Sequence, residues 1–504
     1  MNNTLPNLAF IEYGSLSIMQ KFMHLPDDLN EKIDEDEETI DSKFTYEFKK
    51  TTWGSNFTEK INRNNLEENS ARYNPNNKFN FLKASYLTVN TPPIELKSGY
   101  TQTIQISLCH NVFHNIIEEG ILIIDEEPIQ TINTISLDIW SQINMRIGQG
   151  FRDLYNSMVG HRDYITGKWT NNIPGCPLEC PLPFYYSEHI SKALPLLLFS
   201  SLSRIEHSFK FRLDYSQLVR MRARQPIYGK NEKEEDIIKE DGSKEIQDWT
   251  EWKPIKYNHT YLNSISDREK FPLPNMWGRY SIISPEEKEW RITQQHEYYT
   301  EDIEILNTDD IFKYGDSPSI KVNSQTPAKQ FICLAENIES LKYNNRSNYT
   351  TNNTDISKGW NPVGSIKQNY KTEKRIPEMS TNNFSKIEPW YTCRSSPSDK
   401  GFNIYSFAHN PFHIHPDIGV VFNDIDSVII PTLKNGDPYL NKLNTKKIKS
   451  SDENELLIPD ELNNNNDIKN IDSPEFRIYI ILLVTKRILF EFGKKTIVGY
   501  NLPI

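Results

Sequence analysis

Short runs that alternate polar and apolar residues, separated by turn residues, recur along most of this 504-residue chain. Alternation with a period of two places every second side chain on the same face, which is typical of a half-buried strand. The pattern therefore predicts an all-β fold with only a few short helices. The clearest runs lie at residues 44–53, 81–89, 100–108, 120–130, 207–215, 290–306, 319–323, 329–337 and 476–492.

The composition agrees with strands. The chain contains 25 Tyr and 24 Phe, and aromatic residues make up 12% of it. Large aromatic side chains pack well on the pleated surface of a sheet. Residues 133–158 depart from the pattern, because their apolar residues are spaced by three and four. That spacing predicts a helix, interrupted at Gly148 and Gly150, with an apolar face formed by Ile139, Ile143, Ile147 and Leu154.

Composition also divides the chain. Residues 25–43 are acidic and polar, and residues 217–245 combine basic and acidic residues without a clear periodicity. We interpret the first as an exposed arm and the second as a linker with a charged insertion. Polar tracts at 338–386 and 448–472 are expected to be surface loops. The predicted division is an arm at 1–43, a first barrel at 44–216, a linker at 217–250 and a second barrel at 251–504.

Charge and cysteine content exclude several classes of protein. The net charge of −11 disfavours a general nucleic-acid binder, which needs a basic face to displace counterions from phosphates. The N-terminal residues show no basic region before an apolar segment, so we expect no signal peptide. The apolar run at 478–484 is too short to span a bilayer. Five cysteines predict free thiols in a reducing compartment: Cys109, Cys176, Cys180, Cys333 and Cys393.

The candidate chemistry is concentrated in one histidine cluster. His409, His413 and His415 lie within seven positions and could surround one metal ion. Metal-binding cupin barrels also place a His-x-His on a strand, but they use a Glu a few residues later, where this chain has only Asp417. In the alternative interpretation, the histidines are loop residues between prolines.

The remaining motifs are weaker. Cys176 and Cys180 have a Cys-x3-Cys spacing, but no second pair completes a zinc site. Gly148 and Gly150 are not followed by the Lys-Ser/Thr of a phosphate-binding loop, and no Gly-x-Ser-x-Gly motif occurs. We therefore predict no catalytic residues, no metal ligands and no cofactor-binding residues.

Several segments, taken in order, resemble the major capsid proteins of nucleocytoplasmic large DNA viruses. The most specific is "CPLPFYYSEHISKALPLLLFSS" at 180–201, which is similar to the segment that closes the first jelly roll in that family. Others are 44–61, 107–143 and 155–163 in the first half, and 277–304, 326–337 and 399–430 in the second. Two motifs differ from the family's pattern: "HPDIG" stands where the family has a Pro-Ser-Gly turn, and "VFND" where it has Asn-Phe-Ser-Arg.

This resemblance implies two consecutive eight-stranded antiparallel jelly-roll barrels with long loops. It also implies a structural capsid protein, not an enzyme, that forms a homotrimer and tiles an icosahedral shell as pseudo-hexagonal capsomers. Expected partners are neighbouring capsomers and minor capsid proteins, with no direct nucleic acid binding and a position near an internal membrane. The expected location is the virion capsid, assembled in the host cytoplasm.

The resemblance also reinterprets the histidine cluster. Phe407 and Phe412 become packing residues of a strand leaving the second barrel, and the three histidines become part of a turn that contributes an assembly contact. Alternatives are a paralogous minor capsid or scaffold protein of the same fold, a cupin-type metal-dependent enzyme, and a glycan-binding β-sandwich.

Overall fold

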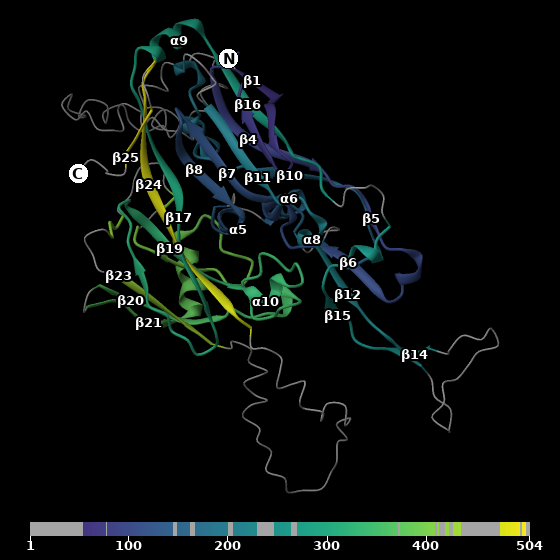
Figure 1. The fold of residues 1–504 in the computed structure, drawn as a ribbon. Helices are drawn as coiled ribbons and strands as arrows, with labels where there is room; N and C mark the ends of the chain where they lie inside the picture. The colour runs from purple at the N-terminus through teal and green to yellow at the C-terminus, as the bar shows by residue number, and fades with distance from the viewer. Residues whose placement is uncertain are drawn as a thin grey trace, which may run out of the picture.

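The computed structural model describes residues 54–434 and 474–499 apart from short gaps. The gaps are 77, 145–148, 162–166, 200–204, 229–245, 264–269, 371–372, 409–410, 413–418, 423–426 and 494–495. Strands dominate the described residues and helices are few and short, which confirms the predicted all-β class (Figure 1). The predicted run at 44–53 lies outside the described residues.

Two antiparallel sheets form the first half of the molecule and share one hydrophobic core, which we call the first core. One sheet has the order β1-β16-β4-β10, and the other has the order β2-β3-β11-β7-β8. The strands of the first sheet are β1 (Gly54–Lys60), β16 (Asn275–Ile283), β4 (Phe81–Asn90) and β10 (Pro177–Pro181). Those of the second are β2 (Asn62–Glu67), β3 (Ser70–Asn74), β11 (Ile205–Phe211), β7 (Ile117–Ile124) and β8 (Glu127–Asn133).

Strand β11 shows why the sequence forms this sandwich. Its buried residues alternate with more exposed ones, so one face of the strand points into the first core. Phe209 lies opposite Gly120 of β7, and a Cβ atom at Gly120 would be 2.4 Å from Cε1 of Phe209. The glycine therefore makes room for the ring that fills the core at this point.

Two further sheets form the second half around a second core. One has the order β17-β24-β19-β22, with β25 also pairing with β24, and the other has the order β18-β23-β20-β21. The first contains β17 (His296–Phe312), β24 (Phe476–Phe490), β19 (Ala328–Asn337), β22 (Asn403–Ser406) and β25 (Ile497–Gly499). The second contains β18 (Ile320–Val322), β23 (Ser427–Leu433), β20 (Val363–Tyr370) and β21 (Glu373–Ser380).

Strand β24 explains the continuous apolar run near the end of the chain. Ile480 and Leu482 point into the second core, whereas Ile481 and Leu483 belong to a separate cluster that we call the junction core. A strand buried on both faces loses the polar and apolar alternation and becomes apolar throughout. In Figure 1, β24 runs beside β17 from the second half toward the first.

Short helices and small sheets connect these sandwiches. The α-helices are α4 (Val112–Ile116), α5 (Thr134–Ile143), α6 (Gln149–Val159), α7 (Tyr185–Glu188), α8 (Tyr215–Leu218), α9 (Pro285–Ile292), α10 (Ile338–Leu341) and α11 (Glu388–Thr392). Single turns are η2 (Ser98–Tyr100), η4 (Ile190–Lys192), η5 (Leu196–Leu198), η7 (His259–Tyr261), η8 (Ile356–Lys358) and η9 (Asn383–Ile387). The small sheets pair β12 (Val219–Ala223) with β6 (Ile104–Leu108) and β15 (Lys253–Ile255), β13 (Pro226–Tyr228) with β14 (Ile246–Trp249), and β5 (Ile94–Glu95) with β9 (Asn172–Ile173). None of the helices within the described ranges is long and apolar enough to cross a membrane.

Several boundaries predicted from the sequence were wrong. The run predicted as a strand from 290 begins as helix, since α9 continues to Ile292 and β17 starts only at His296. Ser284 caps α9 by accepting a hydrogen bond from the Glu287 backbone N–H, and Pro285 occupies its first turn. The helix predicted at 133–158 with an interruption consists of two helices, α5, which ends at Ile143, and α6, which begins at Gln149. Gly150 lies in the first turn of α6, and Gly148 lies outside the described residues.

Two segments predicted as loops or linker also form regular structure. The tract 338–386 contains β20, β21 and a buried turn region, where Asn337 and Asn348 hydrogen-bond to nearby backbone groups. Within 217–250, β12 pairs with both β6 and β15. In the turn region, asparagine side chains provide hydrogen-bond partners for backbone groups that do not pair with another strand, and composition alone does not reveal such contacts.

The predicted domain boundaries stay a prediction. One observation bears on the start of the second barrel at 251: β16 pairs with β1 and β4 of the first half. For description, we call residues 54–283 the first half and residues 296–499 the second half.

Candidate functional site at the junction of the two halves

The three histidines singled out in the sequence, His409, His413 and His415, lie outside the described residues, so their predicted role as an assembly contact stays a prediction. Their neighbours are described. Phe407 packs beside Phe331 and Phe422 at the second core. Phe412 is buried in the junction core, 6.2 Å from the ring of Trp140. Both phenylalanines are therefore packing residues, as expected.

The cysteines are the second group of candidate ligands. All five are free, in agreement with the prediction of free thiols. Burial raises the pKa of the Cys180 thiol, and it raises the pKa of Cys109 to about 12. A thiol that resists ionisation is a poor metal ligand and a poor nucleophile.

The two halves meet through the junction core. Helix α5 contributes Ile139, Trp140 and Ile143, of which Ile139 and Ile143 are fully buried. They pack against the outer faces of β19 and β24, which supply Ile332, Leu334, Ile481 and Leu483. The helix begins at a capping box in which Asn133 accepts from the Ser136 backbone and Ser136 accepts from the Asn133 backbone. The cap fixes where the helix starts and hence which residues face the second half.

A buried polar network lies beside this apolar contact. Asp138 of α5 accepts hydrogen bonds from His114 Nδ1 at 2.7 Å, Asn111 Nδ2 at 3.0 Å and Tyr349 Oη at 3.0 Å. Tyr349 belongs to the second half, and the others belong to the first. His114 Nε2 contacts the Tyr155 hydroxyl at 2.8 Å.

The charge of Asp138 is maintained despite complete burial. Burial by itself would raise its pKa, but the hydrogen bond and the charge of His114 outweigh it and hold the pKa below the usual value. A buried carboxylate with three donors is costly to disturb, because removing one donor leaves part of the charge unsatisfied. The network thus makes the relative placement of the halves specific.

A second cluster at the junction contains His110, His161 and Asp399. His110 Nε2 lies 3.1 Å from Asp399 Oδ2, and His161 Nε2 lies 3.6 Å from Asp399 Oδ1. The two imidazole rings are 4.4 Å apart and inclined by 72°. Sequence reasoning missed this cluster because His110 and His161 are 51 positions apart and Asp399 lies more than 200 positions after both; only the unusual density of histidines at 110 and 114 pointed to the first half.

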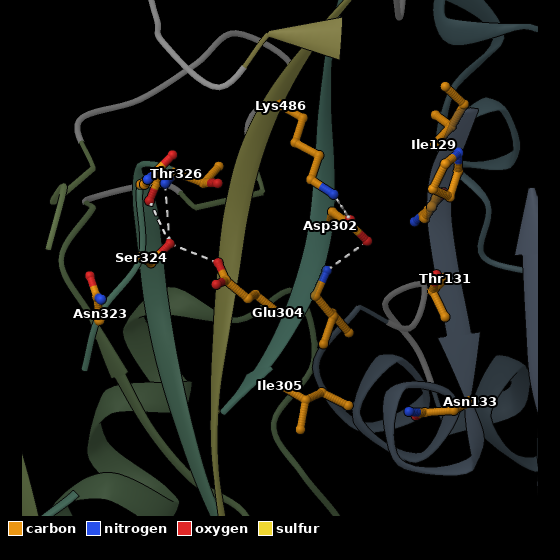
Figure 2. A pocket seen from close by; sticks show the side chains of 14 residues that line it. Ile129, Thr131, Asn133, Asp302, Glu304, Ile305, Asn323, Ser324, Thr326 and Lys486 are labelled. Atoms are coloured by element: carbon orange, nitrogen blue, oxygen red, sulfur yellow. Dashed lines mark hydrogen bonds and ion pairs between the residues drawn. The ribbon is translucent and has the colours of Figure 1, made fainter. Parts of the chain in front are cut away.

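A cleft of about 690 Å³ opens on the same seam, between β8 of the first half and β17 of the second (Figure 2). Figure 2 shows Lys486 paired with Asp302, and Glu304 accepting a hydrogen bond from Ser324 Oγ at 2.7 Å. Burial raises the pKa of Asp302, although Lys486 opposes the shift. Asp302 is thus paired with Lys486 and Glu304 with Ser324, all within the second half, so the charged groups that line the cleft already have partners.

The chain is similar to known capsid proteins. Residues 287–457 match the model of the large eukaryotic DNA virus major capsid protein. The major capsid protein of Tipula iridescent virus is 21% identical over 396 residues, covering 75% of this chain and 79% of the relative. That of Rana tigrina ranavirus is 23% identical over 375 residues, covering 67% of this chain and 70% of the relative.

Solved structures agree on the fold. The Faustovirus major capsid protein superposes with a TM-score of 0.61 at 6% identity, covering 87% of this chain and 91% of that one. PBCV-1 VP54, fitted into a reconstruction of the virophage Sputnik, superposes with a TM-score of 0.59 at 14% identity, covering 89% of this chain and 97% of that one. The order of the sequence motifs, the paired sandwiches and these matches together show that the chain is similar in sequence and fold to the major capsid proteins of large eukaryotic DNA viruses.

Proposed function

We propose that this chain is the main building block of an icosahedral large DNA virus shell and forms a homotrimer that tiles it as a pseudo-hexagonal capsomer. The observation that carries the proposal is the packing of two β-sandwiches against each other through the junction core. A protomer with two similar lobes yields six lobes when three copies surround one axis. Each half is proposed to be an eight-stranded jelly roll, with the division at 44–216 and 251–504 expected from the sequence.

The proposed role is structural and not enzymatic. Its partners would be neighbouring capsomers and minor capsid proteins, with no direct contact to nucleic acid and a place near an internal membrane. The virion capsid would be its location, after assembly in the host cytoplasm. The net charge of −11 supports a shell component that does not bind DNA, because DNA binding needs basic groups that neutralise phosphates.

Exposed apolar side chains support contact with other copies. On and before α11, Ile387 is 54% exposed, Trp390 75% and Tyr391 76%. Large aromatic residues on a surface are enriched at protein interfaces, where their burial contributes much of the affinity. We therefore assign Trp390 and Tyr391 to a contact between subunits.

Sedimentation of the purified full chain, co-expressed with any chaperone that it requires, tests the proposal. The expected particle has three times the mass of one chain. Trp390→Ala combined with Tyr391→Ala should weaken the particle, whereas Trp390→Phe, which keeps an aromatic ring, should preserve it. A folded monomer at all concentrations would contradict the proposed trimer. Equal masses for the wild type and the double variant would contradict the assigned contact.

A further inference from the structure

The cluster of His110, His161 and Asp399 joins three distant parts of the chain. His110 follows β6, His161 follows α6, and Asp399 lies in the segment before β22 of the second half. Each residue offers one ligand atom, and these atoms all lie within 4.8 Å of one another. The side chains are only 3%, 4% and 9% exposed. The cluster is therefore a buried, convergent set of two imidazoles and one carboxylate.

Its dimensions match a small metal site. Bonds of about 2.0–2.1 Å in a tetrahedral zinc site place neighbouring ligand atoms roughly 3.3 Å apart. His110 Nε2 lies 3.1 Å from Asp399 Oδ2 and His161 Nε2 lies 3.6 Å from Asp399 Oδ1, so each imidazole is near that distance from one carboxylate oxygen. An ion could thus be accommodated by small side-chain shifts.

The carboxylate is held in place by a neighbouring amide. Gln142 Nε2 donates to Asp399 Oδ2 at 3.3 Å, and Gln142 Oε1 accepts from the backbone N–H groups of Ser398 at 2.8 Å and Asp399 at 3.1 Å. Asn115 Nδ2 donates to the His110 carbonyl at 2.8 Å. Outer contacts of this kind orient the ligands of metal sites.

We propose that His110 Nε2, His161 Nε2 and a carboxylate oxygen of Asp399 bind one divalent transition-metal ion of the zinc type, which ties the second half to the first. Two imidazoles and one carboxylate favour zinc over magnesium or calcium, which prefer oxygen ligands alone. A water molecule would complete the four ligands. The proposed ligands do not include His409, His413 or His415, and the proposal goes beyond the proposed capsid role.

The first experiment measures zinc bound to the purified full chain after treatment with a chelator and titration with zinc chloride. One ion per chain is expected. Asp399→Asn and His110→Ala should each weaken zinc binding by at least about 100-fold, because each alters a ligand directly, and the loss of a residue that only orients a ligand already costs up to about 100-fold. Gln142→Ala should weaken it by about 10–100-fold. His259→Ala, which removes an exposed histidine that is not part of the cluster, should leave it unchanged.

Contrary results are equally clear. Unchanged zinc binding in Asp399→Asn, or loss of the ion only in His413→Ala, would place the metal elsewhere and overturn the proposal. Absence of stoichiometric zinc in the wild type would also overturn it and leave the cluster as a hydrogen-bonded His-Asp-His contact.

A second measurement uses the wild type alone, because a variant at a buried ligand could fail to fold. Zinc at about 100 times its dissociation constant should raise the thermal midpoint of a cooperative unit of this length by about 2–3 °C. Magnesium at the same concentration should not. Cobalt bound in place of zinc should give visible absorption bands typical of nitrogen and oxygen ligands in a four- or five-coordinate site. An unchanged midpoint with zinc and a colourless cobalt sample would overturn the proposal.

Discussion

Removing one hydroxyl group from the junction should destabilise the protein measurably. Tyr349 lies in the second half and donates from Oη to Asp138 Oδ2 across 3.0 Å, with both side chains buried. The substitution Tyr349→Phe keeps the ring, which packs 5.4 Å from Phe402, and removes only the hydrogen bond. Any loss of stability therefore reports the polar contact and not a cavity.

The expected magnitude follows from the charge of the acceptor. A hydrogen bond to a charged group contributes about 1.5–3 kcal/mol to stability, whereas one between neutral groups contributes about 0.5–1.5 kcal/mol. Tyr73→Phe is the matched control, because Tyr73 is a buried tyrosine that donates to the neutral Pro274 carbonyl at 2.7 Å. We expect Tyr349→Phe to cost about 2 kcal/mol and Tyr73→Phe about 1 kcal/mol.

Urea unfolding of the full chain, followed by tryptophan fluorescence and circular dichroism, measures both values. A double-mutant cycle with Asp138→Asn should give a coupling free energy of about 1–2 kcal/mol for the Tyr349 and Asp138 pair. If Tyr349→Phe costs no more than Tyr73→Phe, or if the coupling is zero, Asp138 does not hold the halves together as argued.

Two further predictions concern the first core. Gly120→Ala should destabilise the protein by about 1–3 kcal/mol in the same urea assay, since its Cβ would overlap Phe209, and Gly120→Ala with Phe209→Leu should recover part of the loss. Full recovery is not expected, and no cost for the single variant would refute the overlap. Burial lowers the pKa of His207, which contacts the Tyr186 hydroxyl at 2.7 Å, from 6.5 to about 4. The contribution of neutral His207 to the free energy of unfolding is therefore fully present above pH 6.5 and is lost as the pH falls toward 4. In this window the histidine is protonated in the unfolded chain but stays neutral in the folded chain. The loss of stability is on the order of 3 kcal/mol. His207→Gln should flatten the pH dependence of stability in this window, and an unchanged slope would contradict the assignment.

The alternating pattern was sufficient to predict the fold class. Strands such as β11 and β4 are half-buried, so their period of two is visible in the sequence. The run at 476–492 was also placed correctly as a strand, although its second buried face was not foreseen. That face depends on α5, which is distant in sequence, and no local pattern encodes it.

The junction sites could not be predicted for the same reason. Asp138, Tyr349 and Asp399 are brought together by the packing of the two halves, and each by itself is an ordinary polar residue. The visible cluster of three histidines at 409–415 drew attention because its members are close in sequence. The cluster of His110, His161 and Asp399 is assembled only by the fold.

Loop segments were the least predictable part. The Asn-rich tract at 338–386 has a composition typical of exposed loops, yet Asn345 and Asn348 are almost completely buried. Their side-chain amides hydrogen-bond to the Asn353 and Asn352 carbonyls, which replaces strand pairing within a compact turn region. Asparagine can serve either an exposed or a buried turn, so its frequency does not distinguish them.

Electron cryomicroscopy of the purified assembly tests the central claim most directly. A capsid protein built from two similar sandwiches per chain should give a particle with three copies around one axis and six lobes in projection. Class averages with that outline are the predicted result. A single two-lobed particle, or a closed assembly whose projections lack six lobes, would contradict the account.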